Sequence, residues 1–220
     1  MTLIGIRLLA CVFCSLMAAP ALAQLRVDSL SDTQGDATLK FPLLKGGDAA
    51  ATQRINTWLQ VTQLKKLPGK YRQSPFEDIV PAPGSSQGVD ALDYAVKGNT
   101  PGYLSLQIQG EYMGASANPF SLSYNFDIKS GELIALQDVF TAPGLTQLTE
   151  RVREKRLKRL DSYLGKAKRD GSVDDGGDAL KMYSACRERF AADDLSTNQL
   201  NLSKNTLTLI ADCATTHYQQ

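Results

Sequence analysis

Two segments in the middle of the chain alternate apolar and polar residues with a period of two. Within residues 103–113 leucine and isoleucine alternate with serine and glutamine, and residues 120–128 repeat the pattern with leucine, tyrosine and phenylalanine. This alternation predicts strands that bury one face and expose the other. A further strand is expected over 89–96, and a Lys-Ser-Gly turn at 129–131 predicts a short one over 133–136.

Other segments carry the helical period. Asp48, a residue type that caps helix N termini, precedes apolar residues spaced three or four apart. Pro143 begins a longer helix that is expected to end near Arg169, and another is expected over about 178–190. The chain then predicts a hairpin that turns at Lys204-Asn205.

These elements predict an α+β fold, with an antiparallel sheet, helices packed on one face and a C-terminal hairpin. Residues 24–220 are expected to form one domain. Residues 65–90 are rich in proline and glycine and predict a long irregular connection, which is either a surface excursion or a functional loop.

Residues 1–23 have the three parts of a secretory signal peptide. Arg7 is their one charge, an apolar run follows it, and small residues end the segment at Ala23. We expect cleavage before Gln24 and a periplasmic or secreted protein. No later stretch is apolar for the roughly 20 residues that a membrane span needs, so no transmembrane span is expected after cleavage.

Charge and cysteine content indicate which partners and which kinds of site are expected. Removing residues 1–23 takes away one of 24 basic residues and leaves 23 basic against 23 acidic side chains, which argues against a nucleic-acid partner. It also leaves two cysteines, Cys186 and Cys213, which predict a disulfide in an exported chain. Their spacing does not match the Cys-x-x-Cys pattern of metal and redox sites.

No catalytic or metal-binding constellation is visible in the sequence. The one histidine, His217, lies four residues from the end of the chain, where a catalytic triad is not expected. The acidic segment 170–178 does not match the ligand spacing of an EF-hand and predicts a solvated linker. We therefore expect no metal, no cofactor and no enzymatic activity. Carboxylate pairs for glycan hydrolysis need a geometry that the sequence does not supply.

Two surface features are candidate interaction sites. The predicted hairpin tip combines small residues with flanking aromatic ones, and its candidate binding residues are Tyr112, Met113, Ser116, Asn118 and Phe120. The alternative is a plain turn. The long helix carries a basic stripe at Arg151, Lys155 and Lys158, which either meets an anionic surface or belongs to a solvated face with helical ion pairs such as Glu154 with Lys158.

Three stretches resemble an exported bacterial domain family, typified by the outer domain of RsiV-type anti-sigma factors and the accessory domain of PdaC-type peptidoglycan deacetylases. They are residues 41–48 with Ile55-Asn56, residues 112–118, and residues 125–140 with their Lys-Ser-Gly turn. The similarity spans about residues 38–145. Family members usually have Gly-Ala-His where this chain has Gly114-Ala115-Ser116.

The resemblance implies an α+β extracytoplasmic recognition module, which senses lysozyme in one branch of the family. It implies no catalysis. The sequence therefore predicts a non-catalytic exported binding module of the bacterial cell envelope, whose partner is an envelope protein or a peptidoglycan-related ligand. The alternatives are a carboxylate-based, glycan-active envelope enzyme and a structural accessory protein.

Overall fold

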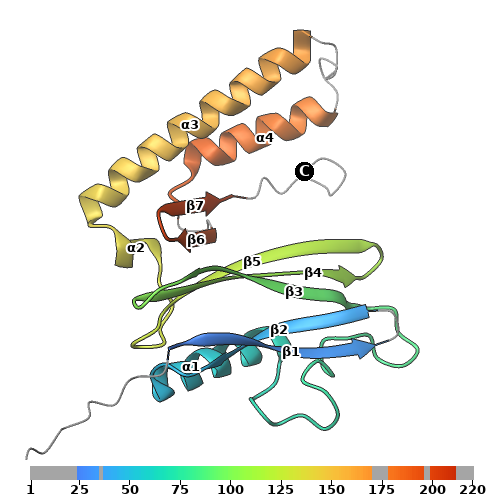
Figure 1. Cartoon of the computed structure of the whole chain (residues 1–220). Coiled ribbons are helices and arrows are strands. Elements are labelled where there is room, and N and C mark those ends of the chain that lie inside the picture. Colours follow the sequence, from blue (N-terminus) through green and yellow to red (C-terminus); the bar gives the residue numbers. More distant parts are fainter. Residues whose placement is uncertain (1–23, 35–36, 170–177, 196–198, 212–220) are drawn as a thin grey trace, which may run out of the picture.

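The computed structural model describes residues 24–34, 37–169, 178–195 and 199–211. Its centre is a five-stranded sheet in the order β1-β2-β3-β4-β5 (Figure 1). The strands are β1 (Arg26–Gln34), β2 (Ala37–Lys45), β3 (Gly88–Asn99), β4 (Tyr103–Met113) and β5 (Ala117–Asp127). The other elements are helices α1 (Ala49–Leu59), α2 (Leu136–Val139), α3 (Ala142–Arg169) and α4 (Asp178–Ala192), the π-helical turn η1 (Gln60–Leu64), and strands β6 (Gln199–Ser203) and β7 (Thr206–Ile210).

The predicted α+β class and the C-terminal hairpin are confirmed. The sheet is antiparallel except between β2 and β3, which pair in parallel at Leu39 and Leu92. The parallel pair arises because α1 and the long connection after it carry the chain back to the starting end of β2 before β3 begins.

Helix α1 covers one face of the sheet, as its apolar period predicts. Asp48 caps it by accepting a hydrogen bond from the Ala51 N–H at 2.9 Å. Ile55 and Leu59 are fully buried against leucines and phenylalanines of β2, β4 and β5. The Trp58 ring packs edge-on against Tyr124, with the ring centroids 5.0 Å apart. This layer is the main hydrophobic core.

The opposite, polar face of the sheet is also covered, because the β6–β7 hairpin lies across it (Figure 1). The hairpin crosses a row of small residues that are direct neighbours on three strands, Gly98, Ser105 and Asn125. A side chain on Gly98 would come within 2.7 Å of the Leu202 carbonyl oxygen. The sequence pattern predicted that this face meets solvent, but in the structure the β6–β7 hairpin packs against it.

Asn125 joins the hairpin to the sheet. Its side-chain amide donates to the Leu200 carbonyl at 2.6 Å and accepts from the Leu202 N–H at 3.1 Å. Ser105 Oγ accepts from the same Leu202 N–H at 3.1 Å. Both side chains are buried. The Asn125 amide thus pairs with the free backbone edge of β6 in the way that a neighbouring strand does.

Helices α3 and α4 form an outer layer beyond the hairpin, so α1 and α3 lie on different sides of the sheet (Figure 1). Leu145, Leu148 and Val152 of α3 pack with the leucines of β6 and β7 in a second, smaller apolar cluster. The prediction had placed both helices against one face. Alternation in β4 and β5 identifies the apolar face but does not indicate that a hairpin covers the other.

The predicted strand over 133–136 is wrong. Leu133 forms one bridge, with Phe126, and Leu136 then begins α2. The Asp138 carboxylate accepts the Ala135 N–H at 2.8 Å at the start of this helix.

Cys186 is buried and disulfide-bonded. Cys213 and residues 1–23 lie outside the described residues, so the Cys186–Cys213 pairing and the signal peptide stay predictions. No helix in the described ranges has the length and apolarity of a membrane span.

We predict that Asn125→Ala lowers the free energy of unfolding by about 2 kcal/mol, because it leaves the buried Leu200 carbonyl without a partner. Urea denaturation measures this change. The matched control is Gln107→Ala, on the same face, whose amide bonds Ser121 Oγ in an exposed position; we expect it to change stability by less than about 0.5 kcal/mol. Equal losses in the two variants would show that Asn125 does not hold the layers together.

Candidate functional site

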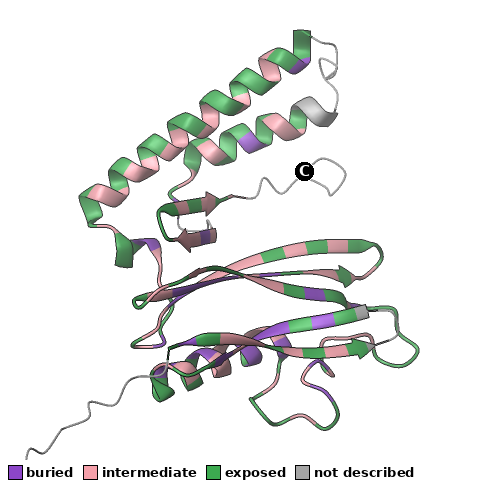
Figure 2. Ribbon diagram, in the orientation of Figure 1, coloured by how far each residue is buried: buried purple, intermediate pink, exposed green. Residues whose placement is uncertain are grey.

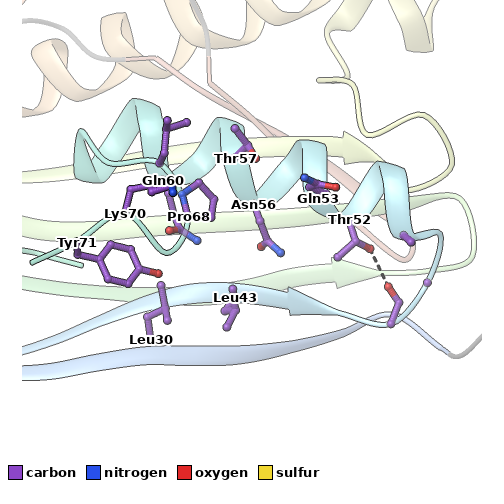
Figure 3. Close-up of a pocket in the computed structure, with 14 residues that line it drawn as sticks. Leu30, Leu43, Thr52, Gln53, Asn56, Thr57, Gln60, Pro68, Lys70 and Tyr71 are labelled. Carbon is purple, nitrogen blue, oxygen red and sulfur yellow. Dashed lines mark hydrogen bonds between the residues drawn. The ribbon is translucent and has the colours of Figure 1, made fainter. Parts of the chain in front are cut away.

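A groove runs along one flank of helix α1 (Figure 3). It has a volume of about 750 Å³. Strands β1 and β2 provide its floor, α1 provides one wall, and the start of the long connection between η1 and β3 provides the other. The groove therefore lies on the α1 side of the sheet, where regular elements hold two of its three sides.

The α1 wall presents a row of amide side chains. Gln53 and Asn56 of α1 and Gln60, which follows the last residue of α1 and begins η1, are spaced three and four residues apart, which places them on one flank of the helix. Asn56 is fixed by two hydrogen bonds of 2.9 Å, to the N–H and the carbonyl of Leu44. Gln53 is exposed. Gln60 is buried, and its Oε1 has no hydrogen-bond partner within the described part of the chain.

The floor is apolar and the far wall is mixed. Leu30 and Leu43 line the floor from β1 and β2. Pro68, Lys70 and Tyr71 line the far wall, and Figure 3 shows the Tyr71 ring reaching toward Leu30. A ligand in the groove therefore meets leucine side chains below it and amide, amine and phenol groups at its sides.

The far wall is held by an ion-pair cluster just behind it. The Lys66 amine lies 2.8 Å from both Glu77 and Asp78. The Glu77 carboxylate also accepts the backbone N–H groups of Arg72, at 3.1 Å, and Gln73, at 3.0 Å. The Lys66 ammonium and these two N–H donors lower the pKa of Glu77 from 4.5 to about 2. An irregular segment is thereby tied down next to Tyr71.

Buried contacts anchor the same connection to the sheet. Phe76 is fully buried in the main core, and Ser74 hydrogen-bonds the Asp32 carboxylate of β1. The connection was predicted as irregular, and it is. Its role as a wall of the groove and part of the core was not expected, because proline and glycine content indicates loop structure but not where the loop packs.

The lining of the groove determines what it can do chemically. Lys70 is the one ionisable side chain besides Tyr71 among the described residues that line it, and none of them is an acid or a histidine. Amides, hydroxyls and an aromatic ring over apolar residues suit a ligand that is largely uncharged and rich in hydrogen-bonding groups. Glycan chains and extended peptides have this chemistry. Proton transfer by a carboxylate pair does not have its residues here.

The predicted hairpin-tip residues do not converge on the groove. Tyr112 is exposed, and the Asn118 amide donates to the Ser116 carbonyl of its own hairpin at 2.6 Å. Met113 pairs with Ala117 at the start of the loop, and Phe120 packs against the main core. The tip is therefore an internally bonded turn with one exposed aromatic ring, and its role in binding stays a prediction.

Phe120 does line a second hollow, of about 530 Å³, on the β3–β5 part of the sheet. This hollow also contains two acids, Asp93 of β3 and Glu111 of β4. Asp93 pairs with Gln109 in the strand register, so Glu111 is its diagonal neighbour. Diagonal neighbours on adjacent strands lie close enough for their side chains to act on one molecule. No pattern in the sequence pairs these two acids.

The remaining candidates are distributed over the outer layer and the chain end. Arg151, Lys155 and Lys158 are all exposed on α3. His217 and residues 170–177 lie outside the described residues. Within the described ranges, no group of three or more His, Cys, Asp or Glu side chains is arranged to hold a metal ion.

Sequence reasoning missed the groove, although one signal was present. The amide row of α1 shares a helical flank that neither the apolar stripe nor charged residues occupy. A run of glutamine and asparagine on a helix flank is consistent with an ordinary solvated surface. The floor and far wall come from segments outside the helix and cannot be paired with it by its periodicity.

No family model matches the sequence, and no curated protein matches it. Similar solved structures include two DUF3298 family proteins. A DUF3298 family member from Bacteroides fragilis NCTC 9343 has 11% identity and a TM-score of 0.45, over 62% of this chain and 68% of the other. A DUF3298 family protein from Pseudomonas aeruginosa PAO1 has 15% identity and a TM-score of 0.44, over 73% of each chain. Neither is named as RsiV-type or PdaC-type, so that typing stays a prediction.

We predict that Glu77→Gln destabilises the protein at neutral pH and that this difference disappears in acid. The pKa of Glu77 is about 2 in the folded protein and ordinarily 4.5. Its carboxylate therefore contributes stability above pH 4.5, and that contribution is lost as the pH falls toward 2. Unfolding by urea at a series of pH values measures both proteins. The control is Asp90→Asn, an exposed acid on β3; a pH-independent Glu77→Gln difference would contradict the prediction.

Proposed function

We propose that this protein is a non-catalytic, exported binding module of the bacterial cell envelope and that its ligand binds in the α1 groove. The observation that carries the proposal is the groove itself, with its amide row, leucine floor and anchored far wall. Its lining offers hydrogen bonds and apolar contact without a set of groups for acid–base chemistry. The resemblance to lysozyme-sensing and peptidoglycan-associated domains supports the same class of function.

Several groups that line the groove are held in place before a ligand binds. Asn56 is locked by its bonds to Leu44, and the far wall is held by Lys66 and Glu77. Binding groups that are ordered before the ligand arrives lose less conformational entropy on binding. A peptidoglycan strand supplies acetamido, hydroxyl and peptide groups for the amides, and its carboxylates complement Lys70.

The test uses two probes, insoluble peptidoglycan and lysozyme. We expect the protein to bind one of them and the groove variant Gln53→Ala/Tyr71→Ala to weaken binding on the order of tenfold, as loss of central contacts usually does. The matched control is Tyr112→Ala/Met113→Ala at the hairpin tip. Cosedimentation measures binding to peptidoglycan, titration calorimetry measures binding to lysozyme, and thermal melting confirms that each variant folds.

Each outcome of this test has a meaning. Weaker binding in the tip variant alone would place the ligand at the hairpin, as the sequence predicted, and not in the groove. Binding of neither probe would contradict the proposal. Release of soluble fragments from peptidoglycan, abolished by Asp93→Asn or Glu111→Gln, would favour the carboxylate-based enzyme, for which the second hollow is the supporting observation.

Export is a separate part of the proposal. The signal-like segment predicts that the protein isolated from its own host begins at Gln24 or its cyclised form. Intact-mass spectrometry of the periplasmic or secreted fraction measures this. A chain that retains Met1 in the cytoplasmic fraction would overturn export without affecting the groove.

A further inference from the structure

Helix α3 concentrates positive charge in a chain that is otherwise balanced. Its 28 residues include nine basic and three acidic side chains. Residues 24–220 as a whole have 23 of each. The rest of residues 24–220 therefore has 14 basic and 20 acidic side chains, which offset the positive excess on α3.

The charges on α3 fall on separate faces. At 100° per residue, six basic side chains lie within an arc of about 100°, and the three acids lie within another arc of about 40°. The only other residue in the basic arc between its first and last members is Ser162. We call this surface the α3 basic face; its members are Arg151, Lys155, Lys158, Arg159, Lys166 and Arg169.

The contacts of α3 show which way this face points. Asp161 bonds Arg187 of α4 at 2.9 Å, and the Arg156 guanidinium lies 5.4 Å from the centre of the Phe190 ring of α4. These two residues flank the side of α3 that faces α4, and the middle of the basic arc is about 180° from it. The α3 basic face is therefore turned away from α4.

The six side chains of the α3 basic face are exposed, and none of them forms an ion pair with another described residue. In contrast, Arg156 bonds the Asp193 carboxylate at 2.7 Å and Arg153 donates to the Asp193 carbonyl at 3.1 Å. Arg153 and Arg156 thus hold α3 against the segment that follows α4, whereas the α3 basic face forms no ion pair with another described residue. Figure 2 shows exposed residues along the whole length of α3.

We propose that the α3 basic face docks the protein on an anionic phospholipid surface. Six positive charges extend over about 27 Å of one helix. Helix α3 lies at the outer edge of the molecule (Figure 1), so a broad flat surface can approach the whole α3 basic face. Linear polyanions are usually held in basic grooves that follow their backbone, and a projecting helix face has the opposite shape.

The composition of the face sets the mode of binding. It contains no apolar side chain that could insert between acyl chains. Attraction is then electrostatic, so binding is reversible and weakens as salt screens the charges. This inference does not depend on the α1 groove or on its ligand.

The experiment measures partition of the purified protein onto vesicles of phosphatidylglycerol mixed with phosphatidylcholine, and onto vesicles of phosphatidylcholine alone. We expect binding to the anionic vesicles only, with a steep decrease as salt is added. The variant Arg151→Gln/Lys155→Gln/Lys158→Gln should lower the partition coefficient on the order of a hundredfold, at about fivefold for each basic residue removed.

The matched control is Lys40→Gln/Lys97→Gln/Lys129→Gln, which removes the same charge from exposed positions in the sheet layer. It should bind within about twofold of the unaltered protein, because its charges lie outside the α3 basic face. Equal losses in the two variants would overturn the proposal, as would equal binding to both kinds of vesicle or salt-independent binding. Binding to soluble polyphosphate without binding to vesicles would identify a polymer ligand and overturn the membrane proposal. Thermal melting of both variants confirms folding, and the salt series on the unaltered protein tests the proposal independently of any variant.

Discussion

Backbone N–H and C=O groups of a strand need partners when they are buried, and two asparagine side chains meet this need where the sheet itself does not. Asn56 pairs with both backbone groups of Leu44, at the end of β2 where β3 no longer runs beside it. Asn125 pairs with the Leu200 carbonyl and the Leu202 N–H at the free edge of β6. An amide presents one donor and one acceptor side by side, which matches the edge of a strand.

The position of both layers follows from these pairings. Asn56 fixes α1 against the sheet and fills one wall of the groove. Asn125 fixes the β6–β7 hairpin, on which α3 packs through its leucines. A side chain also pairs with the backbone at the edge of β5. The Gln199 amide donates to the Ser121 carbonyl, and Pro119 has no N–H that could pair with another chain. A free β5 edge is thereby protected from pairing with other chains.

Local patterns predicted most elements, and the elements that they missed depend on distant contacts. The Asp48 cap, the α3 helix from Pro143 and the hairpin at Lys204-Asn205 follow from neighbouring residues, and all three are confirmed. The parallel β2–β3 pair and the covered polar face could not be predicted, because period-two alternation is the same whether serine and asparagine meet water or another strand. The candidate site shows the same limit. The amide row was readable from α1, but the floor and far wall belong to segments that only the fold brings to it.

The two proposed surfaces lie on opposite sides of one framework. The α1 groove opens on the α1 side of the sheet, whereas the α3 basic face lies beyond the hairpin on the other side (Figure 1). If α3 contacts lipid as proposed, the groove lies on the side of the sheet away from that lipid. Because buried hydrogen bonds from Asn125 and Ser105 join the two layers, the orientation of the groove relative to the lipid is set by the fold. The positive excess on α3 favours one orientation of the protein at an anionic surface.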